Sequence, residues 1–437
     1  MARLAAAAAL AWFIGFPTIA FAICDDDQWH WVDVPGTQCL DGSPTGFAYV
    51  CFPELGPQAP LVVYFEGGGG CFDAATCACE NSCTGPGPYG GCCNSPTATY
   101  ISDHWDRSYS CDGQGWGTCT PKLSSDPAQS AAFNGPTSAF NDGAIHRWNF
   151  VDIPYCTGDG HIGPGSTHDF VDPNNGAPYT AHINGFPNVQ HDIAALQNLG
   201  FAPSKLALWG SSAGGFGAEC GMQTWAQSFP TALQMFAMDN SMPGFYPPFA
   251  PGAASANVFW GLAETCPFVL AEGDTRVGLD GVMRYNAINL PNVRKGFTDD
   301  YRDYAVSGFM CFLGASPEPN GTCSDATLRT LQDETRDIMA GNGNSKFFYH
   351  SSNCHAEKEG DGNAYQCKKA GAVGAPCSCP SGEAECHDAI DCGPTNDLCA
   401  WDPGNCNYDD MQEGGTHFND WVRGLMQIPG YDWDNVP

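Results

Sequence analysis

The chain has 437 residues, which is long for one domain and short for three, and only 15% of its residues are charged. Glycine and proline are abundant (53 and 33), but an aromatic content of 12% is too high for a disordered chain, so we expect a compact protein with many ordered loops. The formal net charge of −31 makes nucleic acids and anionic membrane surfaces poor partners.

Residues 1–22 have the three parts of a secretory signal peptide. Arg3 supplies the positive charge, residues 4–16 form an apolar run, and Ala20-Phe21-Ala22 is a small-x-small cleavage site. The alternative is a membrane anchor, but the run is short for a span and polar residues follow it directly. No later stretch is apolar enough to cross a bilayer. We therefore expect a secreted, extracellular or periplasmic protein without stable membrane insertion.

All 24 cysteines follow the predicted cleavage site. An even, high count behind a signal peptide predicts a disulfide framework formed in an oxidising compartment. A zinc site is the alternative, but Cys77-Ala-Cys79 and Cys377-Ser-Cys379 lack the C-x2-C spacing of such sites, so we expect no metal. Connectivity does not follow from sequence, although Cys71 and Cys77, one short loop apart, are the pair expected first.

The hydrophobic pattern predicts strands that alternate with helices along the chain. Apolar runs indicate strands at 61–65, 148–156, 205–209 and 233–239, and helical periodicity indicates helices at 186–200, 214–229 and 416–427. This alternation predicts an α/β fold with a mostly parallel sheet and helices on both faces. Two cysteine-rich stretches, at about 71–135 and 358–408, interrupt it as loop insertions. No linker divides residues 23–437, so we expect a single domain there.

A Gly-x-Ser-x-Gly pattern stands between the predicted strand 205–209 and the helix that follows. Its residues are Gly210-Ser211-Ser212-Ala213-Gly214. In a nucleophile elbow the turn is so tight that the residues two before and two after the nucleophile must be small. The hydroxyl then projects near a helix N-terminus, which favours developing negative charge. Such patterns also occur in glycine-rich loops, but the strand before and the helix after favour Ser212 as a nucleophile.

The glycine run Glu66–Cys71 follows the predicted strand 61–65. Backbone N–H groups of such a run can turn toward a bound oxyanion, and the N–H of Ala213 would complete the hole. The alternatives are a flexible turn or a phosphate loop. The Lys and Ser/Thr of a phosphate loop are missing, which counts against the second alternative.

A nucleophilic serine needs a base and an acid, which in α/β-hydrolases follow it in the order Asp or Glu, then His. Four histidines follow the elbow: His350, His355, His387 and His417. His355 comes shortly after the apolar 347–349, as a base that follows a strand should. The acid candidates are Asp239, Asp299, Asp300 and Asp303. Spacing alone does not choose among these acids.

Together these motifs resemble the pectin acetylesterase/Notum family over roughly residues 60–360. The similar segments are YFEGGGGCFDAATC (64–77), NFVDIPYCTGD (149–159), LWGSSAGGFGA (208–218), MDNSMPGF (238–245) and FFYHSSNCHAE (347–357). The resemblance implies an α/β-hydrolase-like fold that deacylates glycans or lipidated proteins. It implies Ser212 as the nucleophile and His355 as the base. It also implies Gly68, Gly69 and Ala213 as the oxyanion donors, and Tyr155 and Asp159 as residues of the substrate pocket.

The sequence departs from this family at two places. The family's acid stands in an aromatic-Asp-x-x-Gln pattern, and the nearest match, 298–302, lacks both the aromatic and the glutamine. Within this segment, Asp299 is preferred to Asp300 as the acid of the triad. Gly70 stands near the family's Trp or aromatic residue, an exchange expected to open the pocket.

We expect a secreted serine carboxylic-ester hydrolase that deacetylates a polysaccharide and needs no cofactor. The acidic chain should repel de-esterified pectin, which is polyanionic, unless the face that carries the site is locally neutral, and a neutral acetylated polysaccharide or an aliphatic polyester fits the charge as well. An extracellular polyester or lipid ester is an alternative substrate. A catalytically silent, disulfide-rich binding protein on the same fold is the alternative of another class. The oligomeric state does not follow from the sequence.

Overall fold

The computed structural model describes residues 24–25, 29–67, 70–77, 148–171, 176–240, 243–244, 251–270, 277–300, 303, 306, 325–340, 343–350, 412–413 and 416–427. The predicted signal peptide and nearly all of both predicted insertions lie outside these ranges.

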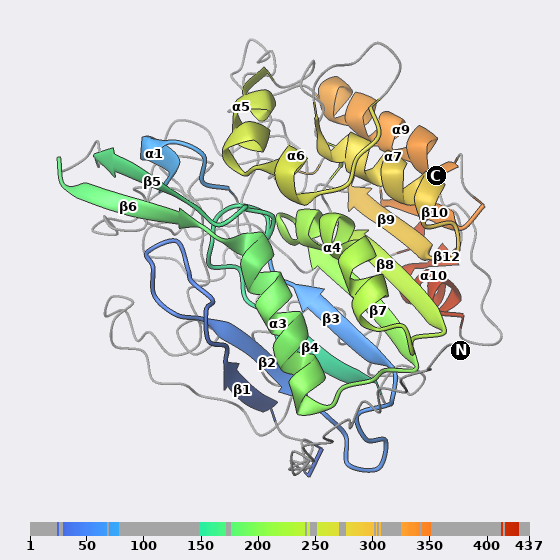
Figure 1. Ribbon diagram of the computed structural model, residues 1–437. Coiled ribbons are helices and arrows are strands. Elements are labelled where there is room, and N and C mark those ends of the chain that lie inside the picture. The colour runs from blue at the N-terminus through green and yellow to red at the C-terminus, as the bar shows by residue number, and fades with distance from the viewer. Residues whose placement is uncertain are drawn as a thin grey trace, which may run out of the picture.

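The centre of the protein is an eight-stranded sheet with the order β1-β2-β4-β3-β7-β8-β9-β10 (Figure 1). Its strands are β1 (Trp29–Asp33), β2 (Gly46–Val50), β3 (Leu61–Phe65), β4 (Asn149–Ile153), β7 (Lys205–Ser211), β8 (Gln234–Asn240), β9 (Arg294–Asp300) and β10 (Ser345–His350). β1 and β2 pair antiparallel with each other, and β2 pairs antiparallel with β4. All other neighbours are parallel, which confirms the predicted mixed α/β class with a mostly parallel sheet.

One face of this sheet is covered by α3 (Gly185–Leu199), α4 (Gly214–Ser228), α7 (Leu279–Asn289) and α9 (Asp325–Ala340), as Figure 1 shows. Apolar side chains of α3 and α4 pack on the β3 residues Val63 and Phe65. The alternate residues Val62 and Tyr64 face the opposite side, where Trp421 of α10 (Phe418–Leu425) packs. Helices therefore lie on both faces, as the alternation predicted, and every side chain of β3 is buried.

Two of the predicted elements have clearly different ends in the structure. β4 stops at Ile153 because Pro154 has no N–H for the sheet, so residues 154–156 leave the strand. The predicted helix 416–427 begins two residues later, since Thr416 and His417 form the short strand β12, which pairs with β11 (Gln412–Glu413). α3 agrees closely, and its C-cap is Gly200 with φ 95°, as expected.

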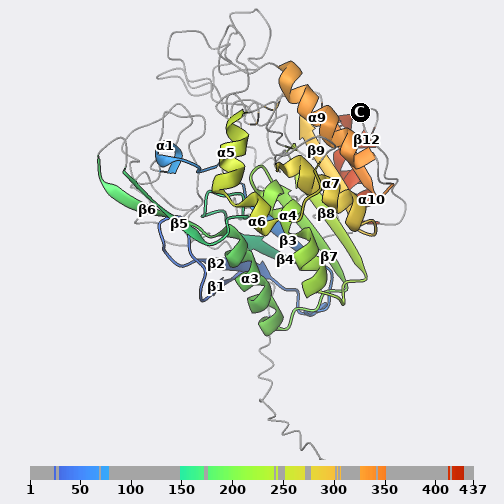
Figure 2. The same cartoon turned by 45° about the horizontal axis from the view of Figure 1, so that its top comes forward.

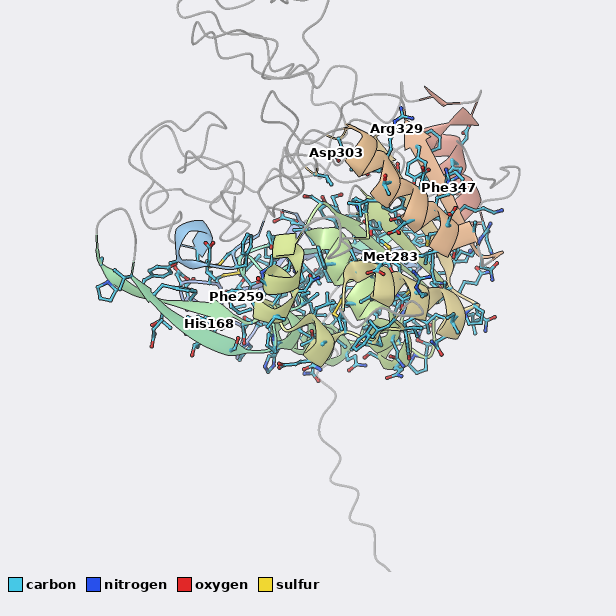
Figure 3. All side chains as sticks on the ribbon, turned by 90° about the horizontal axis from the view of Figure 1, so that it is seen from above. His168, Phe259, Met283, Asp303, Arg329 and Phe347 are labelled. Carbon is cyan, nitrogen blue, oxygen red and sulfur yellow. A yellow bond between two sulfur atoms is a disulfide. The ribbon has the colours of Figure 1, made fainter. Side chains whose placement is uncertain are left out.

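A two-stranded hairpin, β5 (Ser166–Val171) and β6 (Pro178–Ile183), extends beyond the main sheet (Figures 1 and 2). It lies beside α1 (Ala74–Cys77) and α5 (Pro251–Phe259), which is followed by the short α6 (Leu262–Thr265). The ring of His168 lies 4.2 Å from the ring of Phe259, between centroids (Figure 3). This packing fixes the hairpin against α5.

Four disulfides lie within the described residues: Cys24–Cys51, Cys39–Cys156, Cys71–Cys77 and Cys220–Cys266. The expected Cys71–Cys77 pair is confirmed, and this part of the chain has no free cysteine. No helix within the described ranges is long and apolar enough to span a membrane.

Candidate functional site

Ser212 lies in the turn that connects β7 to α4, at the carboxyl edge of the sheet. Its φ of 53° is in the left-handed region, which non-glycine residues seldom adopt. Its carbonyl accepts a hydrogen bond from the N–H of Gly215 at 2.8 Å, in the first turn of α4. The side chain is half-buried. The turn therefore presents one strained serine at the start of a 15-residue helix.

Three glycines allow this turn to form. A Cβ on Gly210 would overlap the backbone of Gly214, and a Cβ on Gly214 would overlap the carbonyl of Phe65. A Cβ on Gly67 would approach the Ser211 carbonyl and would lie 2.7 Å from the Cβ of Ser212. The predicted need for small residues around Ser212 thus has a direct cause. The elbow packs against the exit of β3 with no room for side chains.

Strand β3 is also joined to the elbow by side chains. Phe65 pairs in register with Gly210, and the hydroxyl of Tyr64 is hydrogen-bonded to the Ser211 side chain. Burial raises the pKa of Tyr64 above its ordinary value, so this hydroxyl stays protonated. These contacts hold Gly67, which follows β3, next to Ser212.

The glycine run is anchored at both ends by the turn that follows β4. The Glu66 N–H donates to Ile153 at 3.1 Å, and the Cys71 N–H donates to Gly158 at 2.6 Å. Of the predicted oxyanion donors, Ala213 is buried directly before α4, at its N-cap. Gly68 and Gly69 lie outside the described residues. The structure therefore places the start of the run, at Gly67, and Ala213 beside Ser212.

Tyr155 and Asp159, predicted to line the substrate pocket, are both 0% exposed. The Tyr155 hydroxyl accepts the N–H of Gly160 at 2.8 Å. The Asp159 carboxylate accepts the Thr157 hydroxyl at 2.5 Å and the N–H of Gly185 at 2.8 Å. Burial raises the pKa of Asp159, although these hydrogen bonds oppose the rise. Both side chains hold the turn together, so they act on the site through the backbone rather than as the lining of an open pocket.

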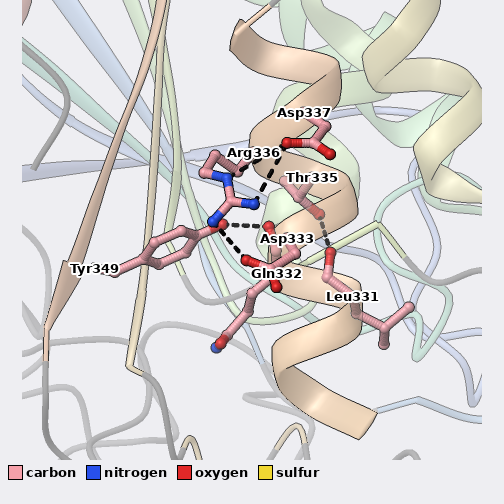
Figure 4. A network of polar contacts seen from close by, with 7 residues as sticks. All are labelled: Leu331, Gln332, Asp333, Thr335, Arg336, Asp337 and Tyr349. Carbon is pink, nitrogen blue, oxygen red and sulfur yellow. Dashed lines mark hydrogen bonds and ion pairs between the residues drawn. The ribbon is translucent and has the colours of Figure 1, made fainter. Parts of the chain in front are cut away.

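Asp299 lies at the carboxyl end of β9, two strands from the elbow strand β7. It is 0% exposed, and its Oδ2 accepts a hydrogen bond from the Gln332 amide at 2.8 Å. Gln332 lies on α9, and its own carbonyl accepts the Tyr349 hydroxyl at 2.5 Å (Figure 4). α9 thus holds the carboxylate of Asp299 through Gln332.

The other acid candidates have different surroundings. Asp300 is the last residue of β9, and its side chain lies outside the described part. Asp239 is buried on β8, where it pairs in register with Gly210 on one side and Phe297 on the other. Asp303 is buried as well, and it accepts the N–H of Val306 at 2.9 Å. Asp239 and Asp299 therefore both reach the edge of the sheet that carries Ser212.

The predicted base, His355, lies outside the described residues, as does His387, and the side chains of His350 and His417 are not described either. Strand β10 ends at His350, beside Asp300 of β9. The chain thus leaves the sheet at the same edge as the elbow, five residues before His355.

Two contacts of the site were missing from the sequence analysis, the Gln332–Asp299 hydrogen bond and a hydrogen bond from His161 Nε2 to the Glu66 carbonyl at 2.8 Å. Each joins residues far apart in the chain, and no local pattern marks them. Within the described residues no three His, Cys, Asp or Glu side chains are arranged to hold a metal ion.

No protein-family model matches the chain, and no curated protein sequence matches it.

Proposed function

We propose that this protein is a secreted serine carboxylic-ester hydrolase with an α/β-hydrolase-like fold and Ser212 as its nucleophile. The observation that carries the proposal is the strained backbone of Ser212, φ 53°, in a glycine-flanked turn between a central parallel strand and a helix. A left-handed non-glycine residue in this setting is the geometry of a nucleophile elbow. The four disulfides of the described part support an oxidising compartment.

The order of the strands supports a triad in the sequence Ser212, Asp299, His355. β8, β9 and β10 follow β7 in order across the sheet. Because these strands are parallel, their carboxyl ends lie at the same edge. Three strand spacings of about 4.8 Å separate β10 from β7, roughly 14 Å in all. Five residues from His350 to His355 span up to about 17 Å when extended. The chain between His350 and His355 is therefore long enough to cover the distance from β10 to β7.

In the proposed reaction Ser212 Oγ attacks the ester carbonyl carbon while His355 takes its proton. The resulting oxyanion accepts hydrogen bonds from the Ala213 N–H and from the glycine run. The bond to the leaving alcohol breaks as His355 returns the proton to that oxygen. Water, deprotonated by His355, then attacks the acyl carbon. The bond from that carbon to Ser212 Oγ breaks as His355 returns the proton to Oγ, which releases the carboxylic acid and restores the serine. Asp299 holds the imidazole in the required tautomer and stabilises its charged form.

The substrate class follows from charge and from the family resemblance. A net charge of −31 opposes the binding of polyanionic, de-esterified pectin. The proposed substrate is therefore an acetylated polysaccharide of low charge, deacetylated as pectin acetylesterase-like enzymes do. Polyester or lipid-ester hydrolysis, and a catalytically silent binding protein, are the competing functions, and the experiment below separates them.

The test combines active-site labelling with a substrate panel. A fluorophosphonate probe should label the wild-type protein and Ser211→Ala but should not label Ser212→Ala. Acetate release from acetylated glycans should exceed hydrolysis of aliphatic polyesters and of p-nitrophenyl esters with long acyl chains. Preference for the long esters would replace the glycan with a lipid or polyester substrate. Absence of labelling in the wild type would refute the esterase proposal.

A further inference from the structure

The turn at residues 154–161 is hydrogen-bonded to both ends of the glycine run. One end of the run is fixed by the hydrogen bond from Cys71 N–H to Gly158, and the other by two contacts to Glu66. In these, the Tyr155 N–H donates to the Glu66 carboxylate at 3.2 Å, and His161 contacts the Glu66 carbonyl. The first peptide of the run is therefore held by a side chain from another segment.

His161 is a buried residue of this turn. It is 4% exposed, and its ring lies 5.3 Å from the ring of Phe65 and 5.0 Å from that of Tyr155, between centroids. Gly217 of α4 provides the space, because a Cβ there would lie 3.0 Å from the Cβ of His161. The residues around the ring leave little space, and the ring therefore packs against Phe65 of β3.

The hydrogen bond at 2.8 Å has a defined direction. The Glu66 carbonyl can only accept, so the hydrogen must be on Nε2 of His161. Burial lowers the pKa of His161 to about 4, so the ring is neutral at neutral pH with its hydrogen on Nε2. A neutral ring suits this place, since it donates one hydrogen bond without adding charge beside the elbow.

The backbone of His161 is itself in the left-handed region, with φ 61°, next to Gly160 with φ 66°. A glycine would adopt this conformation with less strain. The side chain therefore stands at a position where the backbone alone favours glycine, and its polar contact is the one to Glu66. Strained backbone conformations of this kind cluster at functional sites, where the side chain has a role.

The contact orients a peptide that touches the nucleophile. In a trans peptide the C=O of Glu66 and the N–H of Gly67 lie in one plane and point in opposite directions. Gly67 is packed against the Cβ of Ser212, with no space for a side chain between them. Holding the Glu66 carbonyl thus sets the direction in which the run leaves β3, beside Ser212.

We propose that His161 is a positioning residue of the proposed esterase site, whose Nε2–H holds the Glu66 carbonyl and thereby fixes the Glu66–Gly67 peptide beside Ser212. This role rests on the proposed esterase function. His161 touches neither substrate nor nucleophile, and it acts through the Glu66–Gly67 peptide.

The test compares His161→Phe, which keeps an aromatic ring without a donor, with His161→Gln, which keeps a donor near the Nε2 position. With p-nitrophenyl acetate, His161→Phe should lower kcat by about 10- to 100-fold, with KM changed less than about threefold. His161→Gln should restore kcat to within about fivefold of wild type. His168→Phe, a histidine of the hairpin (Figure 3), should match wild type.

Wild-type kcat in His161→Phe, or equal losses in both variants, would overturn the positioning role while Ser212-dependent turnover kept the esterase proposal intact. Turnover that survives Ser212→Ala would instead refute the proposed function. The hydrogen bond has its own readout in ¹⁵N–¹H spectra of the imidazole. A neutral ring with its hydrogen on Nε2 is expected at pH 7, and a hydrogen on Nδ1 would overturn the inference whatever the activity.

Discussion

Acidification should destabilise the protein through His161, because this ring is buried and its polar contact among the described residues is with a neutral backbone carbonyl. Burial lowers its pKa from 6.5 to about 4, while the hydrogen bond to Glu66 opposes the shift. The unfolded chain takes up a proton as the pH falls through 6.5, whereas the folded protein does so only near pH 4. The contribution of His161 to stability is therefore complete above pH 6.5 and is lost between pH 6.5 and about 4.

The size of this loss follows from the difference between the two pKa values. A difference of about 2.5 units at roughly 1.36 kcal/mol per unit corresponds to about 3 kcal/mol between pH 7 and pH 4. Other buried groups act in the opposite direction, because burial raises the pKa values of Asp159, Asp192 and Glu219. The wild-type profile alone is therefore a sum of opposing terms. Comparison with a variant that cannot titrate at position 161 isolates the histidine.

The assay is urea unfolding of wild type and His161→Gln at several pH values from 7 to 4, with disulfides intact. The difference in unfolding free energy between the two proteins should shift by about 3 kcal/mol over this range, against the wild type at low pH. A difference that stays constant from pH 7 to pH 4 would show that His161 titrates normally. The buried, neutral donor inferred above would then be wrong.

Asp299→Asn should lower kcat by several orders of magnitude, whereas Asp300→Asn should retain most activity; the reverse result would move the acid by one residue. Gly214→Ala should cost at least about 2 kcal/mol of unfolding free energy because its Cβ overlaps the backbone after β3, and Gly343→Ala, which has open space, should be nearly neutral in the same urea assay. Reduction by dithiothreitol should lower the unfolding midpoint strongly, since each disulfide contributes about 2–4 kcal/mol; an unchanged midpoint would contradict a structural framework. Asp192→Asn should stabilise the protein at pH 7 in denaturant titrations. Burial raises the pKa of Asp192, so its carboxyl group ionises at a lower pH in the unfolded chain than in the folded protein, and the gain in unfolding free energy should shrink toward pH 4.

The parts of the fold that were predicted correctly are those whose residues are buried on both sides. The runs at 61–65 and 205–209 are continuous and apolar because β3 and β7 lie at the centre of the sheet between two layers of side chains. β1, β2 and the β5–β6 hairpin escaped prediction. β5 alternates half-buried and exposed residues, but its polar composition, STHDFV, hides the strand pattern.

The site divides in the same way into local and long-range features. The elbow is local, since five consecutive residues between a strand and a helix determine it, and the structure has that strand and that helix. The partner of Asp299 is not local, because Gln332 is 33 residues away on α9. His161 is 95 residues from Glu66, and its donor is matched to a backbone carbonyl, which has no residue-specific signature. Such contacts follow from topology and not from pattern.

Backbone strain in this protein is concentrated around one peptide. Within the described residues three non-glycine residues have positive φ, namely His161, Ser212 and Gln427. Gln427 follows α10, where a left-handed residue ends a helix as an ordinary cap. The other two come from different segments and meet at Glu66–Gly67, where His161 holds the carbonyl and the Ser212 Cβ packs on Gly67. Strain at such a site persists only if the surrounding structure fixes it, and the Cys39–Cys156 disulfide joins the turn that carries His161 to the segment before β2. An oxyanion hole requires donors that need little reorganisation when charge develops on the reacting oxygen, and a fixed Glu66–Gly67 peptide fits that requirement of the proposed site.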